Sequence, residues 1–427
     1  MSFPLLAAII VFVLIFILKM PISLGMLAAG LYYFLFSGLK LTLVANQVMN
    51  QLYSNYVLIA VPLFIFTANI MNSGKITAMV FKFANALVGK RHGGLGHVNI
   101  VASVIFSGMT GSAIADASGL GKMEIAAMRE EGYDDGFSCA ITAASATIGP
   151  IFPPSIPLVI YAMFSNTSVG ELFLGGTLPG LLIAFALGIY VMIVSKKRHY
   201  PQGVQMPLRD FIAFGLQSLP SLLTPVILLL GIYTGVMTPT EAGAVAGLYA
   251  ILISIFAYKS LGFHDFKKVV YDTVKDTGGV SLMVGAAAVI SFIVAKEQIG
   301  VSLGHFVLGL TDNKYIFLII VNVMILILGM FIDTSCIQLI FVPILIPLAS
   351  ALGIDLVHFG VMVTLNMMIG LSTPPFGMLL FITSNISGTP LKEVIREIRF
   401  PLAAMIVVLL VVTFIPQSVL FIPSLLK

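Results

Sequence analysis

Long apolar runs follow one another along this chain and limit the folds it can form. Each run has roughly the 17–25 residues that a helix needs to cross a bilayer, and only short loops separate the runs. Charged residues make up 9% of the chain, whereas soluble domains carry about 25%. The runs do not alternate between apolar and polar residues, which excludes a transmembrane β-barrel. The sequence therefore predicts an all-α polytopic membrane protein.

Ten runs are interpreted as membrane spans, at about 4–18, 22–37, 50–72, 137–163, 172–194, 212–233, 240–258, 277–295, 358–384 and 401–424. Two further apolar regions, 93–121 and 315–350, are interrupted midway by SGMTGS and LGMFIDTS, and each is better explained as a re-entrant hairpin. The first run lacks the basic segment and cleavage site of a signal peptide, so we expect a retained first helix. Cys139 and Cys336 lie in apolar runs and are expected to be buried thiols.

The basic residues predict an orientation. Suppose that the N-terminus is periplasmic, that the spans alternate, and that each hairpin returns to its own side. All but four of the 22 Lys and Arg residues then lie on the cytoplasmic side. The exceptions are Lys40, Lys296, Lys314 and Lys427. Because basic residues accumulate in cytoplasmic loops, this bias supports the arrangement, hairpins included.

The second half of the chain repeats motifs of the first half, 221 residues later. IGPIFPPS recurs as IGLSTPPF, with Gly149 matching Gly370 and Pro154 matching Pro375. Gly108-Met109 recurs as Gly329-Met330 at the same spacing. Each half holds five spans and one hairpin, and an odd number of crossings would insert the second copy upside down. Inverted repeats with broken helices near mid-membrane are typical of secondary transporters.

We therefore predict two inverted repeats, residues 1–200 and 201–427. In the first repeat, scaffold helices occupy 1–72, a hairpin 93–121 and a broken helix 137–163. In the second repeat, scaffold helices occupy 212–258, a hairpin 315–350 and a broken helix 358–384.

The prolines in both broken helices indicate a binding function. Proline removes a backbone donor, and freed carbonyls in a membrane must find protein, water or an ion. Carbonyls and hydroxyls suit a hard cation such as Na⁺, and the positive ends of half-helices suit an anionic substrate. The residues around the first break are Ser107, Gly108, Thr110, Gly111, Ser112, Gly149, Phe152 and Pro154; those around the second are Gly329, Asp333, Thr334, Ser335, Gly370, Ser372, Thr373 and Pro375.

Three acids, Asp116, Glu241 and Asp333, lie in or beside apolar segments, where acidic residues are rare. Asp333 is either a cation or proton site or a helix cap, and the sequence leaves both open. Asp116 is better explained by local pairing on the hairpin. Glu241 follows Thr238-Pro239-Thr240 and is typical of a capping residue. The segment ADASGLGKM lacks the first glycine and the final Ser/Thr of a phosphate-binding loop, and no catalytic set is present, so an enzyme is not predicted.

Several long motifs resemble one transporter family over the whole chain. They are PLFIFTANIMNSGKI, GGLGHVNIVASVIFSGMTGSAIADASGLG, MREEGYDD, IGPIFPPSIPLVIY, TPTEAGAVAGLYA and FGVMVTLNMMIGLSTPPFGMLLF. They resemble the large membrane subunit of TRAP (tripartite ATP-independent periplasmic) transporters. The stretch from GHVNI to EGYDD is most similar to the sialic-acid branch, although C4-dicarboxylate relatives share most of it.

The resemblance implies an elevator-type transporter in a bacterial inner membrane, coupled to about two or more Na⁺ per cycle and without an organic cofactor. It also implies two partners, a separate small four-helix membrane subunit and a soluble periplasmic binding protein that delivers the substrate. The hairpins and broken helices would form the moving transport domain, and the outer helices would form the scaffold.

Carried over residue by residue, the family's first sodium site falls on Ser107, Thr110, Gly149, Phe152 and Pro154. The second falls on Gly329, Asp333, Gly370, Thr373 and Pro375. FITSNISG, after the second break, contains no basic residue, so hydroxyls and half-helix N-termini are the expected anchors for the substrate carboxylate. The candidates are Ser112, Ser335, Ser372 and Thr373.

Two other functions compete with Na⁺-coupled import of an organic anion. One is a proton-coupled carrier that uses Asp333 or Asp116. The other is a gated channel, in which the breaks line a continuous pore. The paired, closed hairpins favour a carrier, because a channel needs no alternation between two sides.

Overall fold

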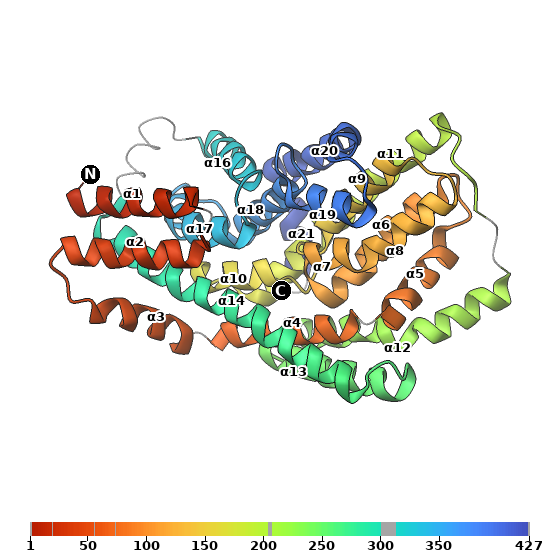
Figure 1. The fold of residues 1–427 in the computed structure, drawn as a ribbon, viewed down its shortest axis with the longest axis horizontal. Helices are drawn as coiled ribbons and strands as arrows, with labels where there is room; N and C mark the ends of the chain where they lie inside the picture. Colours follow the sequence, from red (N-terminus) through yellow and green to blue (C-terminus); the bar gives the residue numbers. More distant parts are fainter. Residues whose placement is uncertain are drawn as a thin grey trace.

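The computed structural model describes residues 2–18, 20–54, 56–72, 74–203, 207–299 and 313–425. Within these ranges the chain is built from helices, and an isolated bridge between His92 and Gln202 is the only extended pairing (Figure 1). The helices of the first half are α1 (Phe3–Ile17), α2 (Ile22–Phe36), α3 (Thr42–Ser54), η1 (Tyr56–Ile59), α4 (Ala60–Met71), α5 (Gly74–Val88), α6 (Gly94–Thr110), α7 (Ala113–Ser118), α8 (Leu120–Glu130), α9 (Asp135–Ser145), η2 (Ala146–Ile148), α10 (Ile156–Ser165) and α11 (Val169–Lys197).

The helices described in the second half are α12 (Leu208–Tyr233), α13 (Pro239–Leu252), η3 (Ile253–Ala257), α14 (Phe263–Lys296), α16 (Lys314–Gly329), α17 (Thr334–Ala351), α18 (Leu356–Leu371), α19 (Met378–Ser387), α20 (Leu391–Phe414) and α21 (Gln417–Leu425). By length and apolar composition, six helices of the described chain can each cross a membrane, and α3 with α4 could form a seventh span. The six are α11, α12, α13 with η3, α14, α17 and α20. These features confirm an all-helical polytopic membrane protein.

Both predicted hairpins and both predicted helix breaks are present. α6 turns at 111–112 into α7 and α8, and α16 turns at 330–333 into α17. The chain leaves helical geometry after η2 and again after α18, at the two proline motifs. The helix starts keep the spacing of the motifs, because α7 and α17 begin 221 residues apart, and so do α9 and α18. The repeated sequence therefore corresponds to a repeated series of helices, a hairpin followed by a broken helix.

Several predicted boundaries are wrong. The run 50–72 is divided between the end of α3, η1 and α4, and because α3 and α4 are sharply bent relative to each other, it is a broken span or a re-entrant segment and not one straight helix. The span at 277–295 begins at Phe263 instead, since a charged amphipathic segment extends α14 towards its N-terminus. The span at 401–424 is α20, which begins at Leu391, and a separate α21, divided by Pro416. The first hairpin continues past residue 121 to the end of α8.

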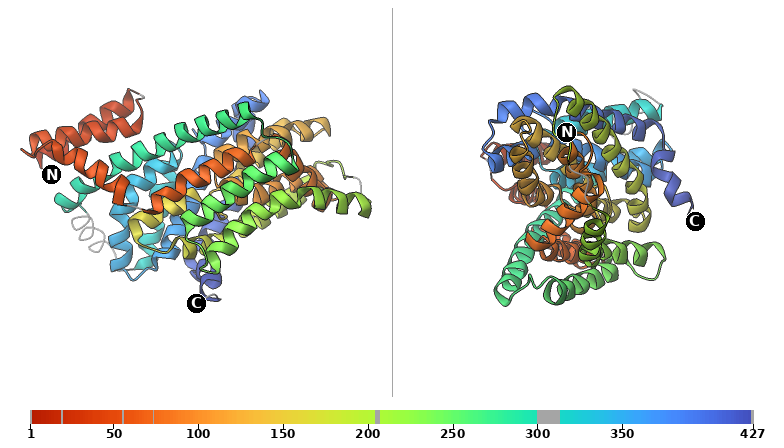
Figure 2. Two further views of the ribbon diagram at one scale, coloured as in Figure 1. Left: turned by 90° about the horizontal axis from the view of Figure 1, so that it is seen from below. Right: turned by 90° about the vertical axis from the view of Figure 1, so that its right-hand side faces the viewer.

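The two halves are intertwined around the breaks. α10, which follows the first break, packs against α17 of the second hairpin, and α19, which follows the second break, packs against α7, α8 and α9. At one end of the molecule α1 and α2 lie together, and α14 runs from α2 and α3 past α4 (Figures 1 and 2). The hairpins and broken helices therefore share one core, and the inward faces of α4, α13 and α14 pack into the same apolar cluster.

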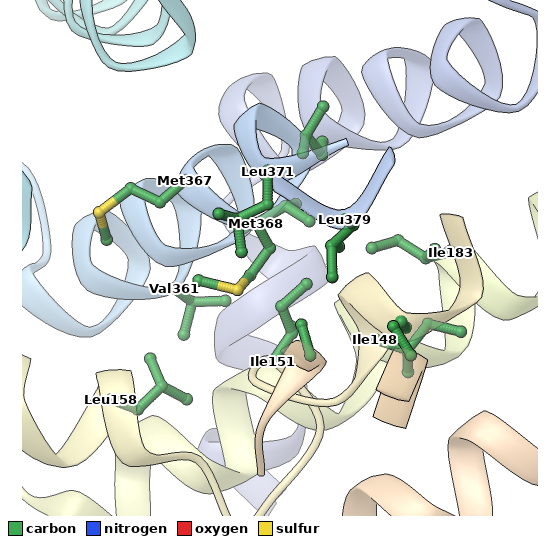
Figure 3. Close-up of a cluster of buried hydrophobic side chains, with 14 of the residues drawn as sticks. Ile148, Ile151, Leu158, Ile183, Val361, Met367, Met368, Leu371 and Leu379 are labelled. Carbon is green, nitrogen blue, oxygen red and sulfur yellow. The ribbon is translucent and has the colours of Figure 1, made fainter. Parts of the chain in front are cut away.

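An apolar cluster fills the space between the two breaks (Figure 3). Ile148 and Ile151 come from the first break, and Met368, Leu371 and Leu379 come from the second; all five are fully or nearly fully buried. Burial of a side chain of this size is worth about 1.5–3 kcal/mol in water. Within a bilayer, where lipid is equally apolar, the close fit of these side chains contributes mainly through dispersion contacts.

Two smaller expectations from the sequence are confirmed. Cys139 and Cys336 are free and buried. Thr238 and Glu241 form a capping box at the start of α13, with the Glu241 carboxylate accepting the Thr238 backbone N–H at 2.8 Å. Substitution of such a cap costs about 1 kcal/mol, so Glu241 has a structural explanation.

Candidate transport site at the two helix breaks

The first hairpin tip lies directly against the first helix break. Gly111 has a left-handed conformation with φ +58°, and a methyl group there would clash with the Pro154 carbonyl oxygen. A methyl group at Gly149 would lie 3.5 Å from the Ser112 carbonyl carbon. Position 111 therefore requires glycine for two reasons. Its positive φ is unfavourable for other residues, and a side chain there would collide with the Pro154 carbonyl oxygen. The backbones of the tip and the break are brought into contact, as predicted from the sequence.

The break itself follows from its prolines. Pro153 has no N–H to donate to the Gly149 carbonyl, four residues earlier, so the helix cannot continue. α10 starts again at Ile156, where the Ser155 hydroxyl accepts the Leu158 N–H at 3.2 Å and donates to the Pro150 carbonyl. The Pro153–Pro154 bond is cis, as is the Pro374–Pro375 bond. Because the helix ends at the first break and begins again at Ile156, carbonyls at the end of one half-helix and N–H groups at the start of the next meet at this point.

The second hairpin also lies directly against the second break. A methyl group at Gly370 would lie 2.7 Å from the Gly329 Cα atom and 3.0 Å from its carbonyl carbon. Beyond this contact, the rings of Phe331 and Phe376 lie 5.5 Å apart, and both are more than half exposed. Gly329 and Gly370, predicted to belong to one sodium site, are therefore in backbone contact.

The predicted hydroxyl ligands are buried and bonded within their own helices. Ser107 donates to the Val104 carbonyl at 2.6 Å, Thr110 to Phe106 at 3.3 Å and Thr373 to Ile369 at 2.7 Å. Ser372 also donates to Ile369, at 3.1 Å. Each hydroxyl has two lone pairs, so donation leaves oxygen lone pairs that can ligate a cation.

Ser112 and Asp333 occupy equivalent places in the two repeats. They lie 221 residues apart, and each is the N-cap of the helix that returns from its hairpin tip. The Ser112 hydroxyl accepts the Ala115 N–H at 3.3 Å, and the Asp333 carboxylate accepts the Ser335 N–H at 2.9 Å. Of the two roles that the sequence left open for Asp333, the structure contains the helix cap. From the sequence, Ser112 was assigned to the substrate and Asp333 to sodium, although the repeat makes the two positions equivalent.

The remaining predicted residues lie farther from the contacts between tips and breaks. Phe152 packs its Cβ and ring against Gly180 of α11, so only its main chain belongs to the break. Pro375 is exposed. Ser335 is half-buried in the first turn of α17.

Two features of this region were not predicted from the sequence. The Phe331–Phe376 contact joins a tip to a break, and only the repeat pattern, by aligning the hairpins, could have drawn attention to it. A polar network behind the first tip includes Glu124, which is buried at 1% exposure. In the sequence, Glu124 lies between Lys122 and Arg129 and outside the long apolar runs, so nothing marked it as buried.

The two breaks bring groups of both polarities together. Four helices, α7, α10, α17 and α19, begin at the tips and breaks, and each N-terminus carries a partial positive charge. The carbonyls at the ends of η2 and α18 carry partial negative charge beside them. Oxygen atoms of this kind suit a hard cation, and the N-termini suit a carboxylate.

Comparisons with known proteins identify the family. The profile described as "Tripartite ATP-independent periplasmic transporter, DctM component" matches residues 9–418. The sialic acid TRAP transporter large permease protein SiaM of Vibrio cholerae is 43% identical over 407 residues, which cover 95% of each chain. The sialic acid TRAP transporter permease protein SiaT of Haemophilus influenzae is 39% identical over 98% of this chain and 68% of its own.

A C4-dicarboxylate TRAP transporter large permease protein, DctM of Pseudomonas aeruginosa, is 37% identical over 87% of both chains. Among solved structures, the YdaH transporter of Alcanivorax borkumensis, described as having an unusual topology, superimposes with a TM-score of 0.58 over 83% of this chain and 84% of its own, at 13% identity. That likeness concerns the fold alone. The sequence matches cover nearly the whole chain, and the chain belongs to the DctM component family of tripartite ATP-independent periplasmic transporters.

Proposed function

We propose that this chain is the large membrane subunit of a Na⁺-coupled importer of an organic anion, working in a bacterial inner membrane by an elevator mechanism. The observation that carries the proposal is the paired contact between hairpin tips and helix breaks, Gly111 with Pro154 and Gly329 with Gly370. Each contact places main-chain oxygens beside half-helix N-termini, and such paired sites near mid-membrane are the binding sites of many secondary transporters.

The proposed sodium sites keep the residues predicted from the sequence. The first comprises Ser107, Thr110, Gly149, Phe152 and Pro154, with Phe152 and Pro154 contributing main-chain oxygens. The second comprises Gly329, Asp333, Gly370, Thr373 and Pro375. Ser112, Ser335, Ser372 and Thr373 are the candidate anchors for the substrate carboxylate.

Two partners belong to the proposal, a small membrane subunit and a periplasmic protein that captures the substrate. The family name describes a tripartite transporter, and in the described part of the chain the segments between helices are short. The proposed substrate is a sialic acid or a C4-dicarboxylate, because relatives named for both are similar over most of the chain. The 43% identity with a sialic acid permease makes sialic acid the first choice.

The test is uptake of labelled N-acetylneuraminate and succinate into proteoliposomes that contain this chain and its small subunit. With the binding protein outside, an inward Na⁺ gradient should drive accumulation, and replacing Na⁺ by choline should abolish it. Uptake driven by a proton gradient without Na⁺ would favour proton coupling. Full uptake without the binding protein would contradict the tripartite arrangement, and downhill flux without accumulation would favour a channel.

A further inference from the structure

A buried polar network lies behind the first hairpin tip, between α6, α8 and α9. The Asn99 amide donates to the Glu124 carboxylate at 2.6 Å and to the Thr142 hydroxyl at 2.7 Å. The Ser145 hydroxyl donates to the Asn99 carbonyl oxygen at 2.6 Å, and the Ser103 hydroxyl lies 3.1 Å from Ser145. All five side chains are at most 1% exposed. The network therefore holds an acid in a place that solvent does not reach.

The carboxyl group of Glu124 is only half satisfied. Its Oε2 atom accepts from Asn99, but its Oε1 atom is buried without a hydrogen-bond partner. A second acid, Asp116 on α7, interacts with Ser103 and also has a buried oxygen without a partner. An ionised carboxylate requires donors or a counter-charge at both oxygens when it is buried, and the Glu124 carboxyl group has neither at Oε1.

No basic side chain of the described chain pairs with Glu124. The ionisable groups on α8 itself and on the helices packed against it are Lys75, Lys82, His97, Asp116, Lys122, Arg129, Glu130, Asp135 and Cys139. Arg129 binds Asp135, Ser387 and Thr389, and Lys75 binds the carbonyls of Tyr258 and Lys259. Lys82, Lys122 and Glu130 are exposed, and Cys139 contacts Ser387 and Thr389. The His97 Nδ1 atom faces Gly188 on α11.

The second repeat shows that the fold does not require these acids. The positions 221 residues after Asp116 and Glu124 are Ile337 and Leu345, which are buried at 1% and 7% exposure. An apolar side chain thus fills the same place in the equivalent hairpin. The acids of the first hairpin are an addition specific to that half, and buried acids in membrane helices are rare and mark functional positions.

We propose that Glu124 is a proton-binding site, a carboxylic acid that carries its proton on Oε1 in the folded protein. A neutral acid removes the unpaired charge and still accepts the Asn99 amide hydrogen on Oε2. The Asp116 carboxyl group strengthens the assignment, because a negative charge there would oppose a second charge on Glu124. This site is separate from the proposed sodium sites and does not depend on them.

Infrared spectroscopy of the purified protein in lipid nanodiscs tests the proposal. The carbonyl stretch of a protonated carboxylic acid is resolved from the absorption of a carboxylate. At neutral pH the parent should show this band. Asp116 also has a buried oxygen without a partner and can hold a proton, so the comparison is made in the Asp116→Asn background, where adding Glu124→Gln should remove the band. Glu130→Gln changes an exposed acid on the same helix and should leave the band unchanged. Asp116→Asn should also retain the Glu124 band.

A folding control accompanies the spectra. Gln is close in shape to a neutral Glu, so Glu124→Gln should elute as the parent does in size-exclusion chromatography and melt within a few degrees of it. If the band is absent from Asp116→Asn, or persists when Glu124→Gln is added to it, the proposal is overturned. A carboxylate band of Glu124 that shifts when Na⁺ replaces choline would likewise overturn it, because the acid would then be an ionised metal ligand.

Discussion

Two glycines, Gly329 and Gly370, let the second hairpin and the second broken helix touch backbone to backbone. Neither residue has a positive φ, so conformational freedom does not explain them. Close approach does, because a methyl group on Gly370 would lie 2.7 Å from the Gly329 Cα atom. Main-chain oxygens can converge on an ion only if the chains come this close.

The first prediction at the residue scale is that Gly370→Ala strongly reduces Na⁺-dependent uptake. The added methyl group must push the two backbones apart, whereas Ala otherwise stabilises a helix by about 1 kcal/mol relative to Gly. Gly278→Ala is the matched control, because nothing lies within 4 Å of a methyl group at that helical position in α14. Initial uptake rates and Na⁺ titrations should show at least about a tenfold loss, equivalent to about 1.4 kcal/mol, for Gly370→Ala only. If both variants had the same uptake rates and Na⁺ titration curves, the Gly329–Gly370 contact would not belong to the sodium site.

The second prediction at this scale concerns the Thr373 hydroxyl. It donates to the Ile369 carbonyl at 2.7 Å, and Thr373→Ala removes one oxygen ligand while leaving the carbonyls in place. A neutral hydrogen bond is worth about 0.5–1.5 kcal/mol, and ion ligation somewhat more. Apparent Na⁺ affinity should therefore fall roughly tenfold, and Thr373→Ser, which retains the hydroxyl, should stay near the parent. An unaltered Na⁺ titration curve in Thr373→Ala would exclude the hydroxyl as a ligand.

Among the contacts between helices, Arg129 binds the first hairpin to the second broken helix. At the end of α8, its guanidinium donates to the Ser387 carbonyl at 2.6 Å and to the Thr389 hydroxyl at 2.8 Å, and it pairs with Asp135 at 2.5 Å. Ser387 ends α19, where a cation also meets the negative end of the helix. Hairpin and broken helix are thus joined across the two halves of the chain.

Replacing Arg129 by Ala should lower the thermal stability of the protein. Each hydrogen bond from a charged donor is worth about 1.5–3 kcal/mol when buried, and the loss will be smaller here because the side chain is one-third exposed. A thermal shift assay in detergent should show a lower melting temperature for Arg129→Ala than for Arg209→Ala, which removes an exposed arginine on α12. Identical melting temperatures of the two variants would show that the three Arg129 contacts contribute nothing to thermal stability.

The elements that the sequence predicted best are those marked by glycine and proline. Both hairpin tips and both breaks lie where SGMTGS, LGMFIDTS and the two proline motifs place them, because these residues act locally. α5 was not predicted, since Lys75 and Lys82 divide its apolar residues. The packing of α10 on α17 could not be predicted, because it joins segments far apart in the chain. The equivalence of Ser112 and Asp333 could have been found from the 221-residue spacing, but two different residue types concealed it.

At the scale of the whole molecule, α11 connects the core to the end of the first half. Its 29 residues span roughly 43 Å at 1.5 Å per residue, more than the hydrocarbon thickness of about 30 Å. Its first turn carries Glu171, and its last turn carries Lys196 and Lys197. α11 is therefore long and apolar enough to cross the membrane, and we expect its two ends to lie on opposite sides.

Cysteine labelling tests this orientation. A thiol reagent that does not cross membranes should reach Ser168→Cys from the periplasm and Lys197→Cys only from the cytoplasm. Both positions are exposed, and the natural Cys139 and Cys336 are buried, so background labelling should be low. Labelling of both positions from one side would contradict the inverted-repeat arrangement.

The Na⁺ dependence of uptake tests the central claim most directly. The two tip-and-break contacts belong to one repeated series of helices, so an ion site built at the first should have a counterpart at the second. In proteoliposomes with the small subunit and the binding protein, initial uptake rate should rise with Na⁺ concentration with a Hill slope clearly above one. Thr373→Ala should shift that curve to higher Na⁺ without an equal change in substrate affinity. A hyperbolic curve with a slope of one, or uptake that does not depend on Na⁺, would contradict two coupled sites.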